Sequence, residues 1–169
     1  MKLIELSQGK QAIVDDEDYE WLSQWKWCFD NKGYARRSQY LGYVNGKQKT
    51  ATTLMHRQIT GNVHGMQVDH INGNKLDNRR SNLRLCTHTE NMRNSRSSVG
   101  SYSKYKGVWL DRRVNKWAAR ICCGNRKRVG LGYFSVESEA AEAYNAAAKK
   151  YHGKFARLNV IDTNMECAA

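Results

Sequence analysis

The sequence of 169 residues contains no proline and only three phenylalanines. Because no proline marks a boundary, any linker has to be recognised from glycine, serine and charge. No apolar run is long enough to cross a bilayer, and the first residues do not have the pattern of a signal peptide. These absences predict a cytoplasmic protein with no membrane partner.

Cysteine is present but follows no ligand or disulfide pattern. The five cysteines form no C-x-x-C pair, and their number is odd. This spacing argues against a disulfide framework and against a zinc site. Free thiols in a reducing cytoplasm are the simplest interpretation.

Acidic residues are scarce in one part of the chain. The net charge is +12, from 28 lysines and arginines against 16 acids. Residues 79–128 contain 14 of the basic residues and only two acids, so this segment accounts for the whole excess. Aromatic residues are threaded through it at Tyr102, Tyr105, Trp109 and Trp117. This combination favours a nucleic acid as the partner. A membrane surface is disfavoured, since no amphipathic basic helix accompanies the charge.

One polar segment combines residues that suit hydrolysis of a phosphodiester. Asp69 and His70 are adjacent, Asn82 follows His70 by twelve residues, and Asn91 follows Asn82 by nine. Carboxylate and carboxamide oxygens are ligands for a hard divalent cation such as Mg²⁺. A neutral imidazole beside such an ion can take a proton from water. The alternative is a polar hairpin, because Asp, Asn and Gly are also turn formers.

Local signals predict how this segment folds. Asn72-Gly73 is a hairpin-turn signal that follows the short β-compatible stretch 68–71. Thr87 and Glu90 form a capping box, so a helix should begin at His88, with the His88 ring pointing away from the hairpin. Neighbouring residues of a regular strand face opposite sides. The acid and the imidazole can therefore share a site only where the strand ends or bulges.

The segment of about 55–95 resembles the HNH nuclease motif of phage homing endonucleases, a strand-loop-strand-helix (ββα-metal) unit. The resemblance implies that Asp69 and Asn91 hold one Mg²⁺ or Mn²⁺ ion and that His70 is the general base. It also implies that Asn82 orients the imidazole through a hydrogen bond. No small-molecule cofactor beyond the metal is expected.

A short helix should begin near Met55 and lead into this motif. Its His56 lies in a Met-His-Arg run that such nucleases often carry. This imidazole either lines the metal site or packs structurally, and we favour packing.

Residues 1–54 are predicted to form a β-rich region. In order, we expect strands near 3–6 and 11–14, a helix started by the acids of 15–18, and hairpins over 25–38 and 40–54. The second hairpin turns at Asn45-Gly46. The cations of these hairpins either contact phosphates or are simply exposed; they are Arg36, Arg37, Lys47 and Lys49.

The second half of the chain begins after a linker. Residues 96–103 are rich in serine and nearly free of apolar side chains. Strands are predicted over 105–110, 116–121 and 128–134, and a helix over 136–151, with Ser135 as its N-cap and Gly153 at its end. Alanines recur along this helix at helical spacing, so it should lie close on a three-stranded sheet. Residues 161–169 form a tail.

Residues 103–160 resemble the DNA-binding domain of plant ethylene-responsive transcription factors. The residues that carry the resemblance include Tyr105-Lys106-Gly107-Val108, 116–121 and Leu131-Gly132-Tyr133-Phe134. The resemblance implies that the sheet enters the major groove. Trp109 and Gly130 depart from the plant pattern, which has Arg and Trp there, so only groove placement and phosphate contact are implied.

The candidate DNA contacts come from both halves. Trp117 among them either contacts DNA or packs on the helix. The full set is Arg79, Arg80, Arg84, Arg93, Arg96, Lys106, Trp109, Arg112, Arg113, Lys116, Trp117, Arg120, Arg126 and Arg128.

The sequence thus predicts an α+β protein. An N-terminal β-hairpin-rich region leads into the ββα-metal unit, and a three-stranded antiparallel sheet packed on one helix follows at 104–160. The predicted function is a site-specific endonuclease on double-stranded DNA, whose homing role rests on resemblance alone. One site per chain would nick one strand, in a monomer or weak dimer. The alternatives are a non-catalytic DNA-binding protein, such as a transcription regulator, and a structural RNA binder.

Overall fold

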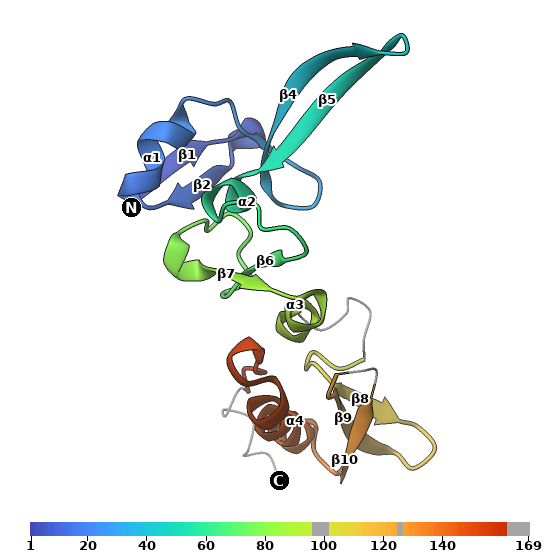
Figure 1. The fold of residues 1–169 in the computed structure, drawn as a ribbon. Helices are drawn as coiled ribbons and strands as arrows, with labels where there is room; N and C mark the ends of the chain where they lie inside the picture. The colour runs from blue at the N-terminus through green and yellow to red at the C-terminus, as the bar shows by residue number, and fades with distance from the viewer. Residues whose placement is uncertain (96–101, 125–126, 162–169) are drawn as a thin grey trace. The chain divides into compact units, whose positions relative to one another are not determined.

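The structure is a computed structural model that describes residues 1–95, 102–124 and 127–161. It divides into two compact units, Met1–Asn91 and Met92–Ala169, which we call unit 1 and unit 2 (Figure 1). Several small antiparallel sheets and few helices make up the fold, as predicted. No helix in the described ranges is long and apolar enough to cross a membrane.

Unit 1 begins with a small hairpin and a helix. Strand β1 (Lys2–Glu5) pairs antiparallel with β2 (Gln11–Val14) across the 3-10 turn Ser7–Gly9. Helix α1 (Asp16–Ser23) follows directly, with three acids in its first turn. These acids lie at the positive end of the helix dipole, which stabilises the start of the helix. The predictions for this region are confirmed.

The next sheet has the order β3-β4-β5. Its strands are β3 (Cys28–Phe29), β4 (Ala35–Val44) and β5 (Lys47–Leu54). Both predicted hairpins form, as β3-β4 and β4-β5, but the break expected between them is absent because β4 runs through both. A register shift between Tyr40 and Tyr43, next to Gly42 at φ 96°, lets the strand continue. The turn at Asn45-Gly46 is confirmed, with positive φ at both residues.

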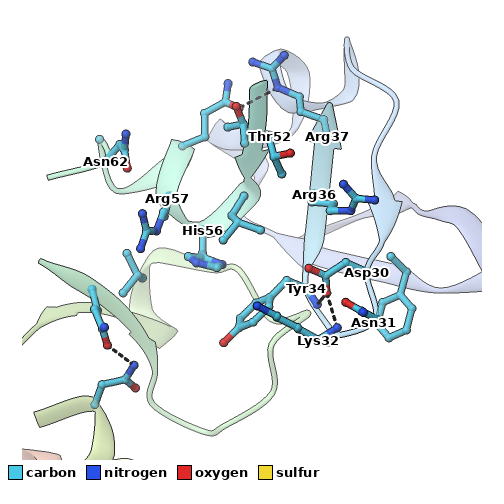
Figure 2. A pocket seen from close by; sticks show the side chains of 18 of the residues that line it. Asp30, Asn31, Lys32, Tyr34, Arg36, Arg37, Thr52, His56, Arg57 and Asn62 are labelled. Atoms are coloured by element: carbon cyan, nitrogen blue, oxygen red, sulfur yellow. Dashed lines mark hydrogen bonds between the residues drawn. The ribbon is translucent and has the colours of Figure 1, made fainter. Parts of the chain in front are cut away.

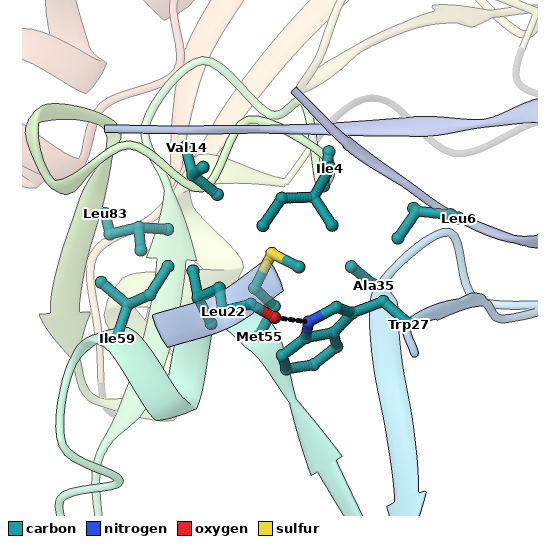
Figure 3. Close-up of a cluster of buried hydrophobic side chains, with 10 residues drawn as sticks. Ile4, Leu6, Val14, Leu22, Trp27, Ala35, Met55, Ile59 and Leu83 are labelled. Carbon is teal, nitrogen blue, oxygen red and sulfur yellow. Dashed lines mark hydrogen bonds between the residues drawn. The ribbon is translucent and has the colours of Figure 1, made fainter. Parts of the chain in front are cut away.

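The core of unit 1 lies between these sheets and α2 (Met55–Ile59) (Figure 3). Met55 and Ile59 project into it from α2, and Leu22 enters from α1. The Trp27 indole is buried there and donates from Nε1 to the Leu22 carbonyl at 2.8 Å. This bond satisfies the one polar atom of the ring in an apolar surrounding.

A second hairpin in unit 1 is formed by β6 (Gln67–His70) and β7 (Leu83–Cys86), joined by a loop that contains the 3-10 turn Arg80–Asn82. Helix α3 (His88–Asn94) follows. The capping box is confirmed: Thr87 N donates to the Glu90 carboxylate at 2.8 Å, and Glu90 N donates to Thr87 Oγ1 at 3.3 Å.

Unit 2 is built on a sheet of order β10-β9-β8. Its strands are β8 (Val108–Asp111), β9 (Lys116–Cys122) and β10 (Arg128–Phe134). Helix α4 (Glu137–His152) covers one face with buried alanines and Tyr144, and the 3-10 turn Gly153–Phe155 ends it. The predicted cap at Ser135 was wrong, because Val136 occupies the N-cap position and no side chain caps the helix.

Close packing of α4 depends on a glycine before β8. Gly107 has φ 77°, and a Cβ there would lie 2.2 Å from the Tyr144 ring and 2.7 Å from the Arg120 carbonyl oxygen. The neighbouring Lys106 backbone is held by the Asn159 side chain, which accepts from Lys106 N at 2.7 Å and donates to Lys106 O at 3.1 Å. No larger residue fits this position without moving the helix.

We therefore expect Gly107→Ala to lower the free energy of unfolding of unit 2 by about 2 kcal/mol or more, through backbone strain and the clash with Tyr144. Urea titration followed by tryptophan fluorescence measures this loss. Gly130→Ala is the matched control, because no atom lies within 4 Å of a Cβ there. Equal losses in the two variants would contradict the packing argument.

Candidate active site

His70 is the last residue of β6 and is 5% exposed. Its Nε2 lies 3.3 Å from Oδ1 of Asn78, which is completely buried. The Asn78 amide nitrogen donates to the Leu76 carbonyl, so Oδ1 can only accept. The imidazole proton therefore lies on Nε2, and Nδ1 carries the lone pair that can accept a proton.

Two further rings pack around His70. The His56 ring lies 5.1 Å from it, nearly perpendicular, and the Tyr34 ring lies 5.0 Å from His56 and 6.0 Å from His70. Burial lowers the pKa of His56 to about 3, helped by His70 and Arg57. Burial also lowers the pKa of His70, and the hydrogen bond to Asn78 Oδ1 opposes this effect. Both imidazoles are thus neutral near pH 7, the form that a general base requires.

Asn82 was expected to hold the imidazole, and the structure gives that contact to Asn78. The Asn82 side chain bonds to backbone, accepting from Asn72 N at 3.0 Å and donating to the Asp77 carbonyl at 2.7 Å. It therefore fastens the loop that carries Asn78. The signal that sequence reasoning missed was Asn78, one of four asparagines in this loop, eight residues after His70.

Asp69 is buried and pairs with Arg84, its direct neighbour on β7, with Arg84 Nη2 2.6 Å from Oδ2. β6 ends at His70, which is the condition under which Asp69 and His70 can share a site. Alternation along the strand places Gln67 and Asp69 on one face and His70 on the other. Because β6 ends at His70, this alternation does not continue beyond the pair, and the Asp69 carboxylate still acts on the His70 ring electrostatically.

Asn91 lies in α3 and is tied to β6. Its amide nitrogen donates to Gln67 Oε1 at 2.8 Å, and His88 Nδ1 lies 3.3 Å from Gln67 Nε2. The expectation that His88 points away from the hairpin was wrong, because Gln67 reaches it. Since Gln67 shares a strand face with Asp69, the Asn91 amide is held on the face that carries the acid. A carboxylate and an amide oxygen there fit a hard divalent cation.

Three arginines predicted to contact DNA have carboxylate partners in unit 1. Arg84 pairs with Asp69, Arg79 pairs with Asp77 at 2.6 Å, and Arg80 pairs with Asp18 at 2.7 Å. The Asp18 carboxylate belongs to a cluster with Asp15 and Glu17, and Arg80 bonds to all three. The charge count along the sequence could not reveal these pairs, which offset part of the positive charge.

In unit 2 the sheet face opposite α4 gathers four of the predicted contacts. Strand pairing and alternation place Trp109, Lys116, Arg120 and Arg128 there. The Arg120 guanidinium lies 4.9 Å from the centre of the Trp109 ring. Trp117 lies on the other face and packs with the core under α4. Of its two expected roles, packing on the helix rather than contact with DNA is therefore the one observed.

The remaining predicted contacts lie elsewhere. The Lys106 ammonium is in the interior of unit 2, where it donates to the carbonyls of Arg93 at 2.6 Å and Ser95 at 2.7 Å. Burial, with a smaller contribution from Arg157, lowers its pKa to about 8. Arg113 pairs with Asp111, and Arg112 contacts the Tyr102 ring. Arg96 and Arg126 lie outside the described residues.

A cavity of about 1240 Å³ lies within unit 1 beside the ring cluster, and neither His70 nor Asp69 is among its described lining residues. Tyr34 and His56 line it on the side of the imidazole cluster, and Gln67 and Asn91 line it on the side of α3. Figure 2 shows His56 between the basic residues of α2 and those of β4. The cavity therefore connects the ring cluster around His70 with one of the two predicted metal ligands.

Known proteins resemble the chain in two ways. A model of the HNH endonuclease family matches residues 53–93. An AP2-like ethylene-responsive transcription factor of Arabidopsis thaliana is 47% identical over 66 residues, which are 38% of this chain and 11% of that protein. A dehydration-responsive element-binding protein of the same plant is 45% identical over 60 residues, or 35% and 29% of the two chains.

One relative is similar over nearly the whole chain. An uncharacterized HNH endonuclease of Acanthamoeba polyphaga mimivirus is 31% identical over 160 residues, which cover 95% of this chain and 80% of that protein. The family match contains the Asp-His pair and both asparagines that the sequence singled out. The chain therefore belongs to the HNH endonuclease family.

Proposed function

We propose that the protein is a DNA endonuclease that hydrolyses one phosphodiester bond per active site. The observation that carries the proposal is the geometry at His70: a buried imidazole at the end of β6 whose Nε2 lies 3.3 Å from Oδ1 of the buried Asn78. Membership of the HNH endonuclease family supports the same reaction. A DNA-binding protein without catalysis has no need of a base prepared in this way.

In the proposed mechanism, His70 Nδ1 takes the proton from the water that attacks phosphorus. Asn78 keeps the ring in the tautomer that leaves Nδ1 unprotonated, and Asn82 keeps the Asn78 loop in place. Asp69 and Asn91 would hold one Mg²⁺ or Mn²⁺ ion. Such an ion, when bound, supplies positive charge for the transferring phosphate and the departing 3′ oxygen. Arg84 holds the Asp69 carboxylate in position.

Unit 2 is proposed to be the targeting half. Its open sheet face carries three cations and Trp109, while α4 covers the other face. A sheet of this kind can enter the major groove and place its cations on phosphates. The likeness to two plant proteins named as a transcription factor and an element-binding protein supports this role. It also favours the alternative of a DNA-binding regulator without catalysis.

One active site per chain implies that a monomer nicks one strand. A double-strand break would then require a second chain or a second binding event. A homing role, in which the enzyme cuts the DNA that flanks its own gene's insertion point, is proposed from the resemblance to phage homing nucleases.

The first test is nicking of supercoiled plasmid in Mg²⁺ or Mn²⁺. We expect the wild type to nick and EDTA to stop it, and His70→Ala to reduce the rate by roughly 10²-fold or more, because a general base contributes that much. His64→Ala is the control, since His64 is exposed, whereas the rings that pack around His70 are those of Tyr34 and His56. If the wild type and His70→Ala both leave the plasmid intact, the protein is a DNA-binding protein without catalysis.

The contact between Asn78 and His70 predicts a rate effect without a binding effect. We expect Asn78→Ala to slow nicking roughly 10- to 100-fold, as loss of a hydrogen-bond partner to a working histidine does, with unchanged DNA affinity. Asn78→Asp keeps the acceptor and adds a negative charge beside the ring. It should therefore recover part of the rate and move the acid limb of the pH–rate profile to higher pH. A wild-type rate in Asn78→Ala would remove Asn78 from the mechanism.

The open face of unit 2 predicts where affinity is lost. Arg120→Gln/Arg128→Gln should weaken binding to duplex DNA roughly tenfold or more, measured by fluorescence anisotropy. Lys149→Gln/Lys150→Gln removes the same charge from α4 on the helix side of the sheet and should have a smaller effect. Equal losses would mean that only total charge counts.

A further inference from the structure

The paired strands β4 and β5 extend well beyond the sheet to which they belong. β3 pairs only with Ala35 and Arg36, so the rest of β4–β5 is a two-stranded ribbon. Figure 1 shows it projecting from the rest of unit 1. Most of its side chains are exposed on both faces. An isolated two-stranded hairpin is only marginally stable in water, and this one contributes little to the core.

The ribbon is basic throughout. From Ala35 to Leu54 the chain has four cations and no acid. Lys47 and Lys49 lie near its tip on β5, and Arg36 and Arg37 lie at its base on β4. Six of the other residues are threonine, serine or glutamine, and they supply hydrogen-bonding groups along both strands. The ribbon is therefore complementary to a polyanion that also presents hydrogen-bonding groups.

The tip of the ribbon also exposes apolar side chains. Tyr40 and Tyr43 form an edge-to-face pair with ring centres 6.1 Å apart, and Tyr43 is 71% exposed. Leu41 and Val44 beside them are half exposed. Aromatic and apolar groups carried between cations are suited to contact with bases and thymine methyl groups.

The base of the ribbon forms one wall of the cavity described above. Arg36 and Thr52 face it from the ribbon, and Arg57 and Asn62 face it from α2 and the residues that follow (Figure 2). Asp30 is the sole carboxylate among its described lining residues, and its Oδ1 accepts from Lys32 N and Tyr34 N. Unlike Arg84, neither Arg36 nor Arg57 pairs with a carboxylate in the described part of the chain.

We infer that the β4–β5 ribbon and the groove at its base form a second DNA-binding surface, one that belongs to unit 1 itself. The ribbon enters the major groove of the duplex, whose width admits a two-stranded ribbon. Phosphates of the strand to be cut lie against Arg36 and Arg57, in the groove that reaches Asn91. The inference rests on the proposed function and adds to it how unit 1 holds its substrate.

The test uses the full chain and a random-sequence duplex in EDTA, so that cleavage plays no part. Lys47→Gln/Lys49→Gln should weaken binding and lower the slope of log affinity against log salt by roughly 1 for each lysine, because each phosphate contact releases counterions. Lys2→Gln/Lys10→Gln removes the same charge from exposed positions outside the ribbon and should leave the slope unchanged. Thermal melting verifies that all variants fold.

Two further measurements separate the ribbon from a general charge effect. Tyr43→Ser should weaken binding without changing the salt slope, because it removes a base contact and no charge. Duplex RNA of the same sequence should compete poorly, since its major groove is too narrow for a ribbon.

The inference is overturned if the two lysine pairs behave alike, or if duplex RNA competes as well as DNA. If Lys47→Gln/Lys49→Gln or Tyr43→Ser binds DNA weakly but still nicks plasmid at high protein concentration, the result supports DNA binding by the ribbon. Loss of nicking in His70→Ala alone concerns the catalytic proposal, so the two failures remain distinct.

Discussion

The contact between the His70 imidazole and the buried Asn78 amide is the interaction on which the proposed chemistry depends. Asn78 is held from several sides: its backbone N–H donates to the Ile13 carbonyl on β2 at 2.8 Å, and Ile13 N donates to Leu76 O at 2.8 Å. Asn82 fastens the same loop from the β7 side. The orientation of the base thus depends on a strand more than fifty residues earlier, which explains why the amino-terminal hairpin and the nuclease motif form one compact unit.

Ion pairing, rather than the density of basic residues in the sequence, determines which cations are available to bind phosphate. The arginines closest to the motif, Arg79, Arg80 and Arg84, are bound by carboxylates and hold the loop and hairpin together. A buried or half-buried ion pair of this kind is a poor surface for phosphate, because its charge is already compensated. Other cations lie on the ribbon and on the open sheet face of unit 2, among them Lys47, Lys49 and Arg128.

Unit 2 shows how small residues create that open face. Alanines on α4 and Gly107 before β8 let the helix lie close on the sheet, so one face is fully used for the core. Trp109 and Arg120 then lie on the other face, where the guanidinium is 4.9 Å from the centre of the indole ring. Lys106 was predicted to contact DNA. Its ammonium group instead donates to the carbonyls of Arg93 and Ser95 at the C-terminal end of α3, where unpaired carbonyls favour a cation.

The sequence by itself determined what depends on near neighbours: the turn at Asn45-Gly46, the capping box of Thr87 and Glu90, the helical spacing of α4, and the spacing of the nuclease motif. These signals act within a few residues, where backbone preference and local hydrogen bonds dominate. Only the tertiary structure decided which asparagine meets His70, which arginines are paired, and which face of the sheet is open. Those outcomes depend on contacts between residues distant in the chain, which share no periodic pattern. The structure also joined the two expected hairpins into one three-stranded sheet, since β4 continues past the break that local signals suggested and pairs with both β3 and β5.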